Sequence, residues 1–183
     1  VIVAGEVTCD GYVDIPQIVR ETIRRIGYTD ATLGFDADSC AVMVTLDRQS
    51  PDIAQGVNTG EGAHSEQGAG DQGLMFGYAC RETDSLMPLP IDLSHKLVAK
   101  HAAVREEKII PHLRPDAKSQ VTVAYDGNTP KQVTTVVIST QHGPEWSNNQ
   151  TALKDAVIEH IIKPVLGTWW NDNIEVHVNP TGI

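Results

Sequence analysis

The sequence has few cysteines, few aromatic residues and no excess of positive charge. Its three cysteines, Cys9, Cys40 and Cys80, are widely spaced, and none belongs to a Cys-x-x-Cys pair. This pattern favours free thiols in a reducing compartment over disulfides or zinc ligands, so we expect a cytoplasmic protein. The formal net charge of −10 argues against a nucleic acid or an anionic membrane as the main partner, although a local basic site for phosphate is compatible with it.

Long apolar runs are also missing. No stretch approaches the roughly 20 apolar residues of a membrane span, and no signal-peptide pattern is present. The hydrophobic content of 40% and the charged content of 21% are typical of globular domains. Because the sequence starts inside an apparent strand without an initiator Met and stops on the turn 179–183, we expect an internal piece of a longer polypeptide.

Apolar periodicity and turn residues predict the secondary structure. Strands are expected over 1–7, 41–46, 121–125, 133–139 and 174–178, and helices over 15–26, 90–108 and from 149 to just before Pro164. The central helix is expected to turn Ile91, Leu97, Val98, Ala102 and Val104 inward. This order of elements predicts an α+β fold with mixed or antiparallel sheets that carry helices on one face.

A glycine-punctuated stretch, residues 67–78, contains Gly68-x-Gly70-x-x-Gly73. The dinucleotide-binding fingerprint of this form needs an apolar strand directly before it, and residues 58–67 are polar, so we reject that interpretation. Two interpretations stay open: a surface turn that leads into a core strand, and a loop whose backbone approaches a ligand.

Residues 47–73 show no periodicity, and a structureless stretch of this length is usually functional or disordered. We favour a mobile lid over a plain linker.

Several polar residues are candidates for chemistry. Glu6 lies in an apolar strand, where it either faces water at an edge or receives a substrate ammonium. Lys118 either forms an exposed ion pair with Asp116 or neutralises a transferring phosphate. Asp71, ringed by glycines, is a candidate to meet a ligand hydroxyl or amine.

Other polar and aromatic residues carry no assignment. His95 and His101 are six residues apart, which puts them on different helix faces and disfavours a metal pair. His142, Trp169 and Trp170 have no functional partner in the sequence.

Five segments in one order carry a resemblance. They are Gly34-Phe35-Asp36-Ala37-Asp38-Ser39-Cys40, Gln49-Ser50-Pro51-Asp52-Ile53-Ala54-Gln55-Gly56, residues 67–78, Arg114-Pro115-Asp116-Ala117-Lys118-Ser119-Gln120 and Ser139-Thr140-Gln141-His142. Together they closely resemble the S-adenosylmethionine synthetase (methionine adenosyltransferase) family over essentially the whole chain. The resemblance implies that this chain contains part of the repeated α+β domains of that family. Residues 1–48 would end an N-terminal domain, 49–66 would form a flexible active-site loop, and 67–183 would form a truncated central domain.

The resemblance also implies an activity. Members make S-adenosylmethionine, a one-carbon donor, from ATP and L-methionine, and they hydrolyse the displaced triphosphate to pyrophosphate and phosphate. They need Mg²⁺ and K⁺, and they form homodimers, commonly paired into homotetramers, with active sites at the dimer interface.

By motif, Glu6 and Gln49 would bind methionine, and Asp116, Ala117 and Lys118 would bind ATP. Lys118 and, less directly, Asp71 would serve catalysis. The flexible loop would comprise Gln49, Ser50, Pro51, Asp52, Ile53, Ala54, Gln55, Gly56, Val57, Asn58 and Thr59.

The family's metal ligands, its upstream ATP-binding motif and its downstream phosphate loop have no counterpart in these residues. We therefore expect the 183-residue segment alone to make no product. The alternative function is a non-catalytic truncated fragment or paralogue that acts as a dimerisation partner. A phosphotransferase of another kind would need a phosphate-cradling loop on a helix, which we do not find.

Overall fold

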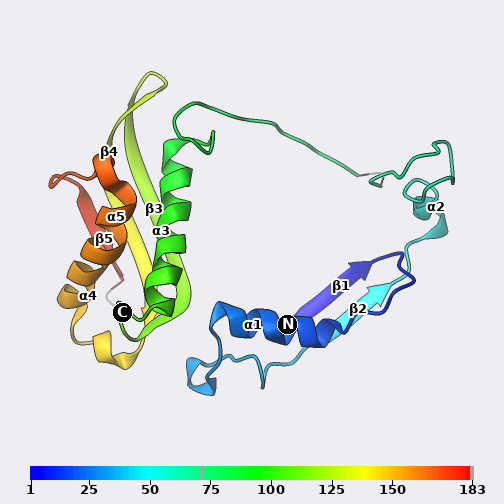
Figure 1. The fold of residues 1–183 in the computed structure, drawn as a ribbon, viewed down its shortest axis with the longest axis horizontal. Helices are drawn as coiled ribbons and strands as arrows, with labels where there is room; N and C mark the ends of the chain where they lie inside the picture. Colours follow the sequence, from blue (N-terminus) through cyan, green and yellow to red (C-terminus); the bar gives the residue numbers. More distant parts are fainter. Residues whose placement is uncertain (71, 182–183) are drawn as a thin grey trace. The chain divides into compact units, whose positions relative to one another are not determined.

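The computed structural model describes residues 1–70 and 72–181. The chain folds into two compact units, Val1–Phe76 and Gly77–Ile183 (Figure 1). The mixture of small sheets and helices confirms the α+β class.

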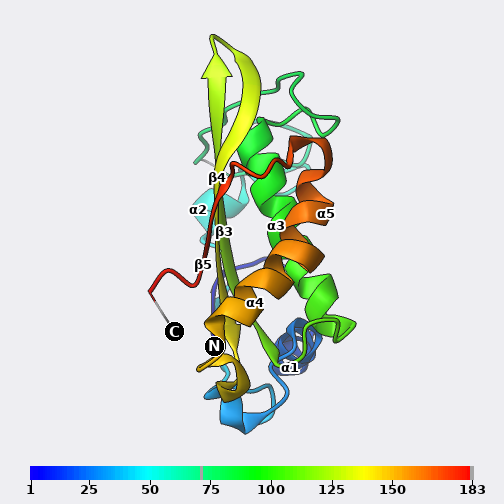
Figure 2. The same cartoon turned by 90° about the vertical axis from the view of Figure 1, so that its left-hand side faces the viewer.

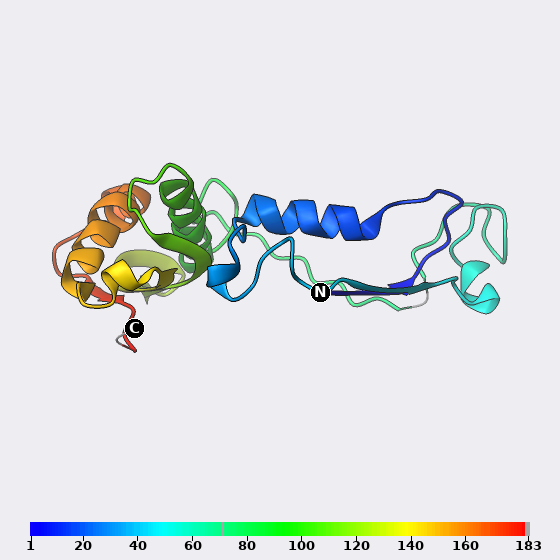
Figure 3. The same ribbon diagram turned by 90° about the horizontal axis from the view of Figure 1, so that it is seen from below.

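The first unit is built on a parallel strand pair joined by a helix. Strands β1 (Ile2–Glu6) and β2 (Met43–Asp47) pair in parallel, and the helix α1 (Ile15–Ile26) makes the crossover between them. The predicted helix over 15–26 is confirmed as α1: the Asp14 carboxylate accepts the backbone N–H of Gln17, and Gly27 ends the helix at φ 111°. Figure 3 shows α1 running along one face of the strand pair. A short 3₁₀ turn, η1 (Ala31–Leu33), and a short helix, α2 (Pro51–Ala54), complete this unit.

The second unit is a three-stranded sheet covered by helices on one face. Strands β3 (Leu113–Asp126) and β4 (Thr129–His142) form an antiparallel hairpin, and β5 (Glu175–Val178) adds to β4 in parallel. The helices α3 (Leu89–Glu106), α4 (Gln150–Val157) and α5 (Lys163–Leu166) lie on one side of this sheet (Figure 2). The 3₁₀ turns η2 (Pro144–Trp146) and η4 (Gly167–Trp169) flank them. The strands predicted over 121–125 and 133–139 are confirmed, and both are longer than expected, with the hairpin turn at residues 127–128.

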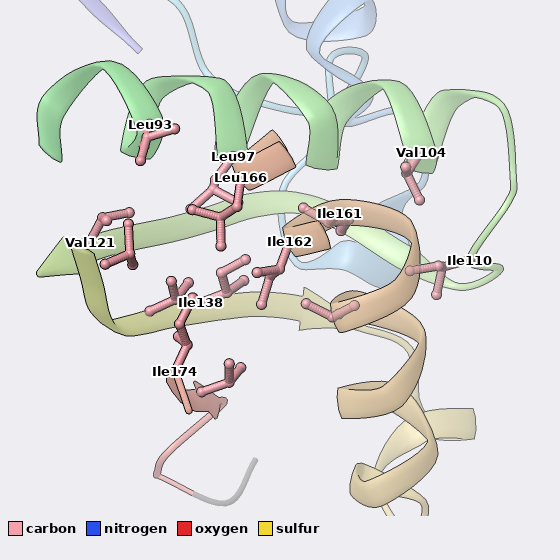
Figure 4. Packing of buried hydrophobic residues seen from close by; sticks show 14 of the residues in the cluster. Leu93, Leu97, Val104, Ile110, Val121, Ile138, Ile161, Ile162, Leu166 and Ile174 are labelled. Carbon is pink, nitrogen blue, oxygen red and sulfur yellow. The ribbon is translucent and has the colours of Figure 1, made fainter. Parts of the chain in front are cut away.

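The core of the second unit lies between these helices and the sheet. Figure 4 shows Leu93 and Leu97 of α3 above Val121 and Ile138 of the sheet, with Ile161 and Ile162 between them. The predicted inward position of Ile91 was wrong, because its side chain is 38% exposed. The helix begins at Leu89, and the buried stripe therefore runs through Leu89, Leu93, Leu97, His101 and Val104.

The helix predicted to stop before Pro164 continues through it, so that boundary was wrong. Between α4 and α5 the chain forms one π-helical turn, η3 (Ile158–Ile162). Proline has no N–H and its ring clashes with the carbonyl four residues earlier in an α-helix. The wider π turn directly before Pro164 changes that geometry, and Ile161 and Ile162 both stay fully buried.

The segment that leads into α3 is tied down by Glu82. Its Oε2 atom accepts the backbone N–H of Leu89 at 2.9 Å and the Tyr125 hydroxyl of β3 at 2.5 Å. These two donors hold the pKa of Glu82 below its ordinary value of 4.5. Burial and the bond to Glu82 raise the pKa of Tyr125 to about 12. The carboxylate therefore joins the start of the second unit to both α3 and the hairpin.

Tyr125→Phe is expected to lower the Tm by about 2 °C at pH 7, because one hydrogen bond to a partly exposed carboxylate is lost. A group with a lowered folded pKa stabilises the fold above its unfolded pKa, here 4.5, and loses that effect as the pH falls through the folded value. Thermal melts at pH 7 and pH 3 should therefore show a difference between variant and wild type that shrinks in acid. Tyr28→Phe is the control, because the Tyr28 hydroxyl has no hydrogen-bond partner among residues 1–70 and 72–181. A Tyr125→Phe difference that does not shrink would show that Glu82 ionisation is not involved.

Candidate functional site

The two residues predicted to bind methionine lie at or just after the ends of neighbouring strands. Glu6 closes β1 and pairs with Asp47, the last residue of β2, and Gln49 follows two residues later. The carboxyl ends of parallel strands meet at one edge of a sheet, which is why residues far apart in sequence come together. Gln49 also lines a hollow of about 380 Å³ beside this edge, together with Val7, Cys9, Arg48 and Asn58.

The charge at this edge is negative. Val44 and Leu46 of β2 share an apolar hollow with Ile15 and Pro16 of α1, so the next residue, Asp47, points to the opposite sheet face with its partner Glu6. Two carboxylates at paired positions repel each other unless a cation lies between them. Neither forms an ion pair with any residue of the described chain. The arrangement suits a ligand ammonium group.

The loop after β2 folds back on itself. Within it, α2 carries Pro51–Ala54, and the N–H of Gly68 donates to the carbonyl of Val57 at 3.1 Å. A Cβ on Gly62, at φ 67°, would lie 2.4 Å from the Gln55 carbonyl oxygen, and one on Gly68 would lie 1.9 Å from that of Gly56. These contacts explain why the loop is rich in glycine. The loop also forms a hollow of about 320 Å³, and the lining of this hollow includes Asp52, Gly62 and His64.

The glycine-rich stretch after this loop contains Asp71, which lies outside the described residues. The flanking residues 66–70 and 72–80 have no regular secondary structure, so the fingerprint glycines follow no strand and precede no helix. The expected alternative, a turn into a core strand, was wrong, since Leu74, Met75 and Phe76 are 82–89% exposed and not in a strand.

The predicted ATP-binding residues Asp116, Ala117 and Lys118 lie on β3 of the second unit. The hydroxyl of the next residue, Ser119, donates to the Ser94 carbonyl of α3 at 2.7 Å, so Lys118 projects from the opposite face of the sheet. Lys118 is exposed and forms no ion pair with a described residue, Asp116 included. Its ammonium is therefore available for an anionic ligand.

Two further polar residues share this helix-free face. Ser139 of β4 pairs with Lys118, and Gln141 follows two residues later on the same side of the strand. The Oε1 atom of Gln141 is buried without a hydrogen-bond partner among the described residues. A buried oxygen without a hydrogen-bond partner costs free energy unless a group outside the described residues, such as a water or a ligand, donates to it. The sequence motif includes residues 139–142, but the motif alone does not tell which side of the sheet each residue faces. In the folded strand, side chains alternate, so Gln141 and Thr140 lie on opposite faces.

A buried polar network lies on the other side of the same strands. The Nε2 atom of His101 is 2.6 Å from the Thr140 hydroxyl, and the Thr140 N–H donates to Oδ1 of Asn179 at 2.8 Å. Burial, followed by the charge of Arg105, lowers the pKa of His101 despite the opposing charge of Asp116. The sequence disfavoured a metal pair and predicted a solvated or hydrogen-bonded histidine at position 101, but the partners of His101 could not be predicted from it.

The residues left without an assignment have structural partners. The Nδ1–H of His142 donates to the Gly143 carbonyl, and its Nε2 accepts from the Gln150 amide. Trp169 and Trp170 pack against the core, and the Lys163 Nζ atom lies 5.7 Å from the centre of the Trp170 ring. These contacts account for all three residues by packing and hydrogen bonding.

Within residues 1–70 and 72–181, no group of three or more His, Cys, Asp or Glu side chains could hold a metal ion. None of the helices in this part of the chain is long and apolar enough to cross a membrane.

Comparison with known proteins adds to this geometry. Residues 66–183 match the family described as S-adenosylmethionine synthetase, central domain, and residues 1–51 match the N-terminal domain of the same family. A curated relative, the S-adenosylmethionine synthase of Desulfosudis oleivorans (strain DSM 6200 / JCM 39069 / Hxd3), is 52% identical over 181 residues. The match covers 98% of this chain and 46% of that protein, so the chain spans less than half of the relative's length. With two domain matches and this identity, the chain belongs to the S-adenosylmethionine synthetase family.

Proposed function

We propose that this chain is part of an enzyme that makes S-adenosylmethionine from ATP and L-methionine. The methionine sulfur donates an electron pair to C5′ of the ribose, the C5′–O bond breaks, and its electrons leave with the triphosphate. Water then cleaves the triphosphate to pyrophosphate and phosphate. The observation that carries the proposal is the exposed Lys118, which forms no ion pair with any described residue and lies on the same sheet face as Gln141, whose Oε1 atom also has no hydrogen-bond partner among those residues.

In this proposal the ATP-binding triplet stabilises the leaving group. A displaced triphosphate gathers negative charge, and a fixed ammonium lowers the energy of that charge most where water is excluded. Asp116 and Ala117, which lie on the same strand as Lys118, position the nucleotide. Asp71 in the glycine-rich stretch is a further catalytic residue in this proposal. The loop 49–59 closes over the site and excludes water.

In this proposal the methionine-binding residues belong to the first unit. Glu6 meets the substrate ammonium and Gln49 contacts the rest of the amino acid. The paired carboxylates of Glu6 and Asp47 support this role. A thioether is a weak nucleophile, so its orientation toward C5′ is the main contribution that these residues make to the rate.

Glu6→Gln in the complete enzyme is expected to raise the KM for methionine by about 10- to 100-fold, because a charge-assisted hydrogen bond to the ammonium is lost. The KM for ATP should change little. Initial rates at varied methionine and saturating ATP measure this effect. Glu21→Gln, which removes an exposed glutamate of α1, should leave both constants unchanged. An unaltered methionine KM in Glu6→Gln would remove Glu6 from the binding site.

The proposal includes partners and cofactors of the whole protein. We assign it two chains that share each active site, a homodimer and commonly a homotetramer, and the helix-free face of the three-stranded sheet supports such pairing. Mg²⁺ and K⁺ are required cofactors in this proposal. The described residues contain no group of three or more His, Cys, Asp or Glu side chains that could hold a metal ion, and no step is assigned to a metal. The location is cytoplasmic.

The decisive experiment measures methionine-dependent release of triphosphate products by the complete reading frame that contains this segment. Product formation that requires both substrates is the expected result. A folded, ATP-binding protein that forms no product would instead favour the non-catalytic dimerisation partner.

A further inference from the structure

The polar network behind the proposed ATP-binding strand connects four elements. His101 lies on α3, Thr140 on β4, Asn179 directly after β5, and Gln150 at the start of α4. His101, Thr140 and Asn179 are only 2%, 4% and 5% exposed. Polar groups this deeply buried are costly unless they are paired, so the network imposes one arrangement on the elements it joins.

Thr140 is the centre of this network and is also the partner of Ala117. The pairing of β3 with β4 places Ala117 opposite Thr140 and Lys118 opposite Ser139. The ladder is irregular just before this point, with a register shift between Leu113 and Ala117. Regular strand pairing therefore resumes at Ala117, the second of the three proposed ATP-binding residues, and Thr140 is its partner.

His101 fixes Thr140 from the helix side. The Thr140 hydroxyl donates to the Gln141 carbonyl at 3.2 Å, so the ring Nε2–H donates to the hydroxyl oxygen. The charged groups that act on the ring are Arg105 of the same helix and Asp116 of β3, and burial keeps the pKa of the ring below its ordinary value. The ring is thus neutral, with a defined donor aimed at Thr140.

Asn179 fixes Thr140 from the other edge. Its backbone N–H donates to the Ile138 carbonyl at 2.9 Å, and its side-chain Oδ1 accepts the Thr140 N–H. Asn179 has φ 46°, a left-handed conformation that asparagine tolerates better than most residues. Its side chain thereby continues the pairing with β4 beyond the end of β5.

We propose that His101 is a positioning residue. Through its hydrogen bond to the Thr140 hydroxyl, and together with Asn179, it holds residues 116–118 in the geometry that binds ATP. This inference rests on the proposed function, because it assigns the consequence to ATP. His101 does not touch the substrate, since it is buried on the helix side of the sheet. Its effect reaches the nucleotide only through the position of β3.

His101→Leu in the complete enzyme tests this role. Leucine has a similar volume, and Thr140 keeps its hydrogen bond to Gln141, so the Tm should change by no more than about 3 °C. The kcat/KM for ATP should fall about tenfold, because misplacement of a substrate-binding group lowers the rate without direct contact. The KM for methionine should stay within about twofold of wild type. His101→Gln, whose amide can donate to Thr140, should restore most of the ATP constant.

Hydrogen exchange gives a readout that does not depend on activity. The backbone amides of residues 113–120, Pro115 excepted, should exchange at least about fivefold faster in His101→Leu than in wild type, because the strand segment loses its support. His95→Leu is the matched control, since His95 lies on the same helix with an exposed side chain and should change neither exchange nor kinetics.

The outcomes separate this inference from the proposed function. With an active wild type, unchanged ATP kinetics and unchanged exchange in His101→Leu overturn the positioning role alone. Equal losses toward ATP and methionine with a large fall in Tm, not rescued by His101→Gln, also overturn it, because they show a purely structural residue. A wild-type enzyme without methionine-dependent triphosphate release overturns the proposed function, and this inference falls with it.

Discussion

Lys118→Ala in the complete enzyme is expected to lower kcat by about 10²- to 10³-fold, while methionine still binds. The Lys118 ammonium is exposed on the helix-free sheet face and has no anionic partner in the described part of the chain. The Lys118 charge therefore balances no carboxylate of the described residues. Its removal should mainly weaken the stabilisation of the leaving triphosphate. Single-turnover rates at saturating ATP measure the chemical step, and equilibrium dialysis measures methionine binding.

Lys131→Ala is the matched control for Lys118. Lys131 is also exposed on the same sheet, but its Nζ atom lies 3.7 Å from Asp126 Oδ2 near the tip of the hairpin. An exposed pair of this kind contributes little, so this variant should keep normal rates and a normal Tm. Near-normal turnover by Lys118→Ala would contradict the role of Lys118 in the reaction.

Deletion of residues 55–66 removes most of the predicted active-site loop 49–66. This deletion is expected to lower the maximal rate at least about tenfold, because the loop can no longer exclude water from the site. The Tm should change by about 2 °C or less, since the glycine contacts and hydrogen bonds of this stretch are formed within the loop. Steady-state rates and thermal melts on the same preparation test both expectations.

A length-preserving variant separates loop closure from loop composition. Substitution of His64 and Glu66, both exposed, by serine keeps the backbone path and should leave the rate near wild type. A fall of more than about 10 °C in the Tm of the shortened enzyme would instead show that the loop is structural.

Local signals in the sequence were sufficient for most elements. Asp14 and Gly27 mark both ends of α1 because a cap and a left-handed glycine act within one turn of the chain. The alternation of Val121 and Val123 likewise predicts β3. Prediction was less reliable where local rules compete with packing. Pro164 is a strong stop signal, yet the helix passes it because burial of Ile161 and Ile162 favours a π turn.

For the candidate site, sequence motifs pointed to residues that would touch a ligand. Glu6, Gln49, Asp116 and Lys118 stand in recognisable segments, and strand pairing then places Glu6 near Gln49. No spacing pattern could connect His101 to Thr140, which are 39 residues apart and belong to a helix and a strand. Their contact depends on how α3 packs on the sheet.

The family of this chain and the order of its helices and strands follow from local composition and motif, because caps, turns and periodicity act over a few residues. Packing alone decided which side chains of each strand face helices and which face outward, so that Thr140 contacts His101 of α3 while Lys118 is exposed on the opposite face of the sheet. The physical reason is that burial and polar pairing depend on neighbours from distant segments, which only a folded chain brings into contact.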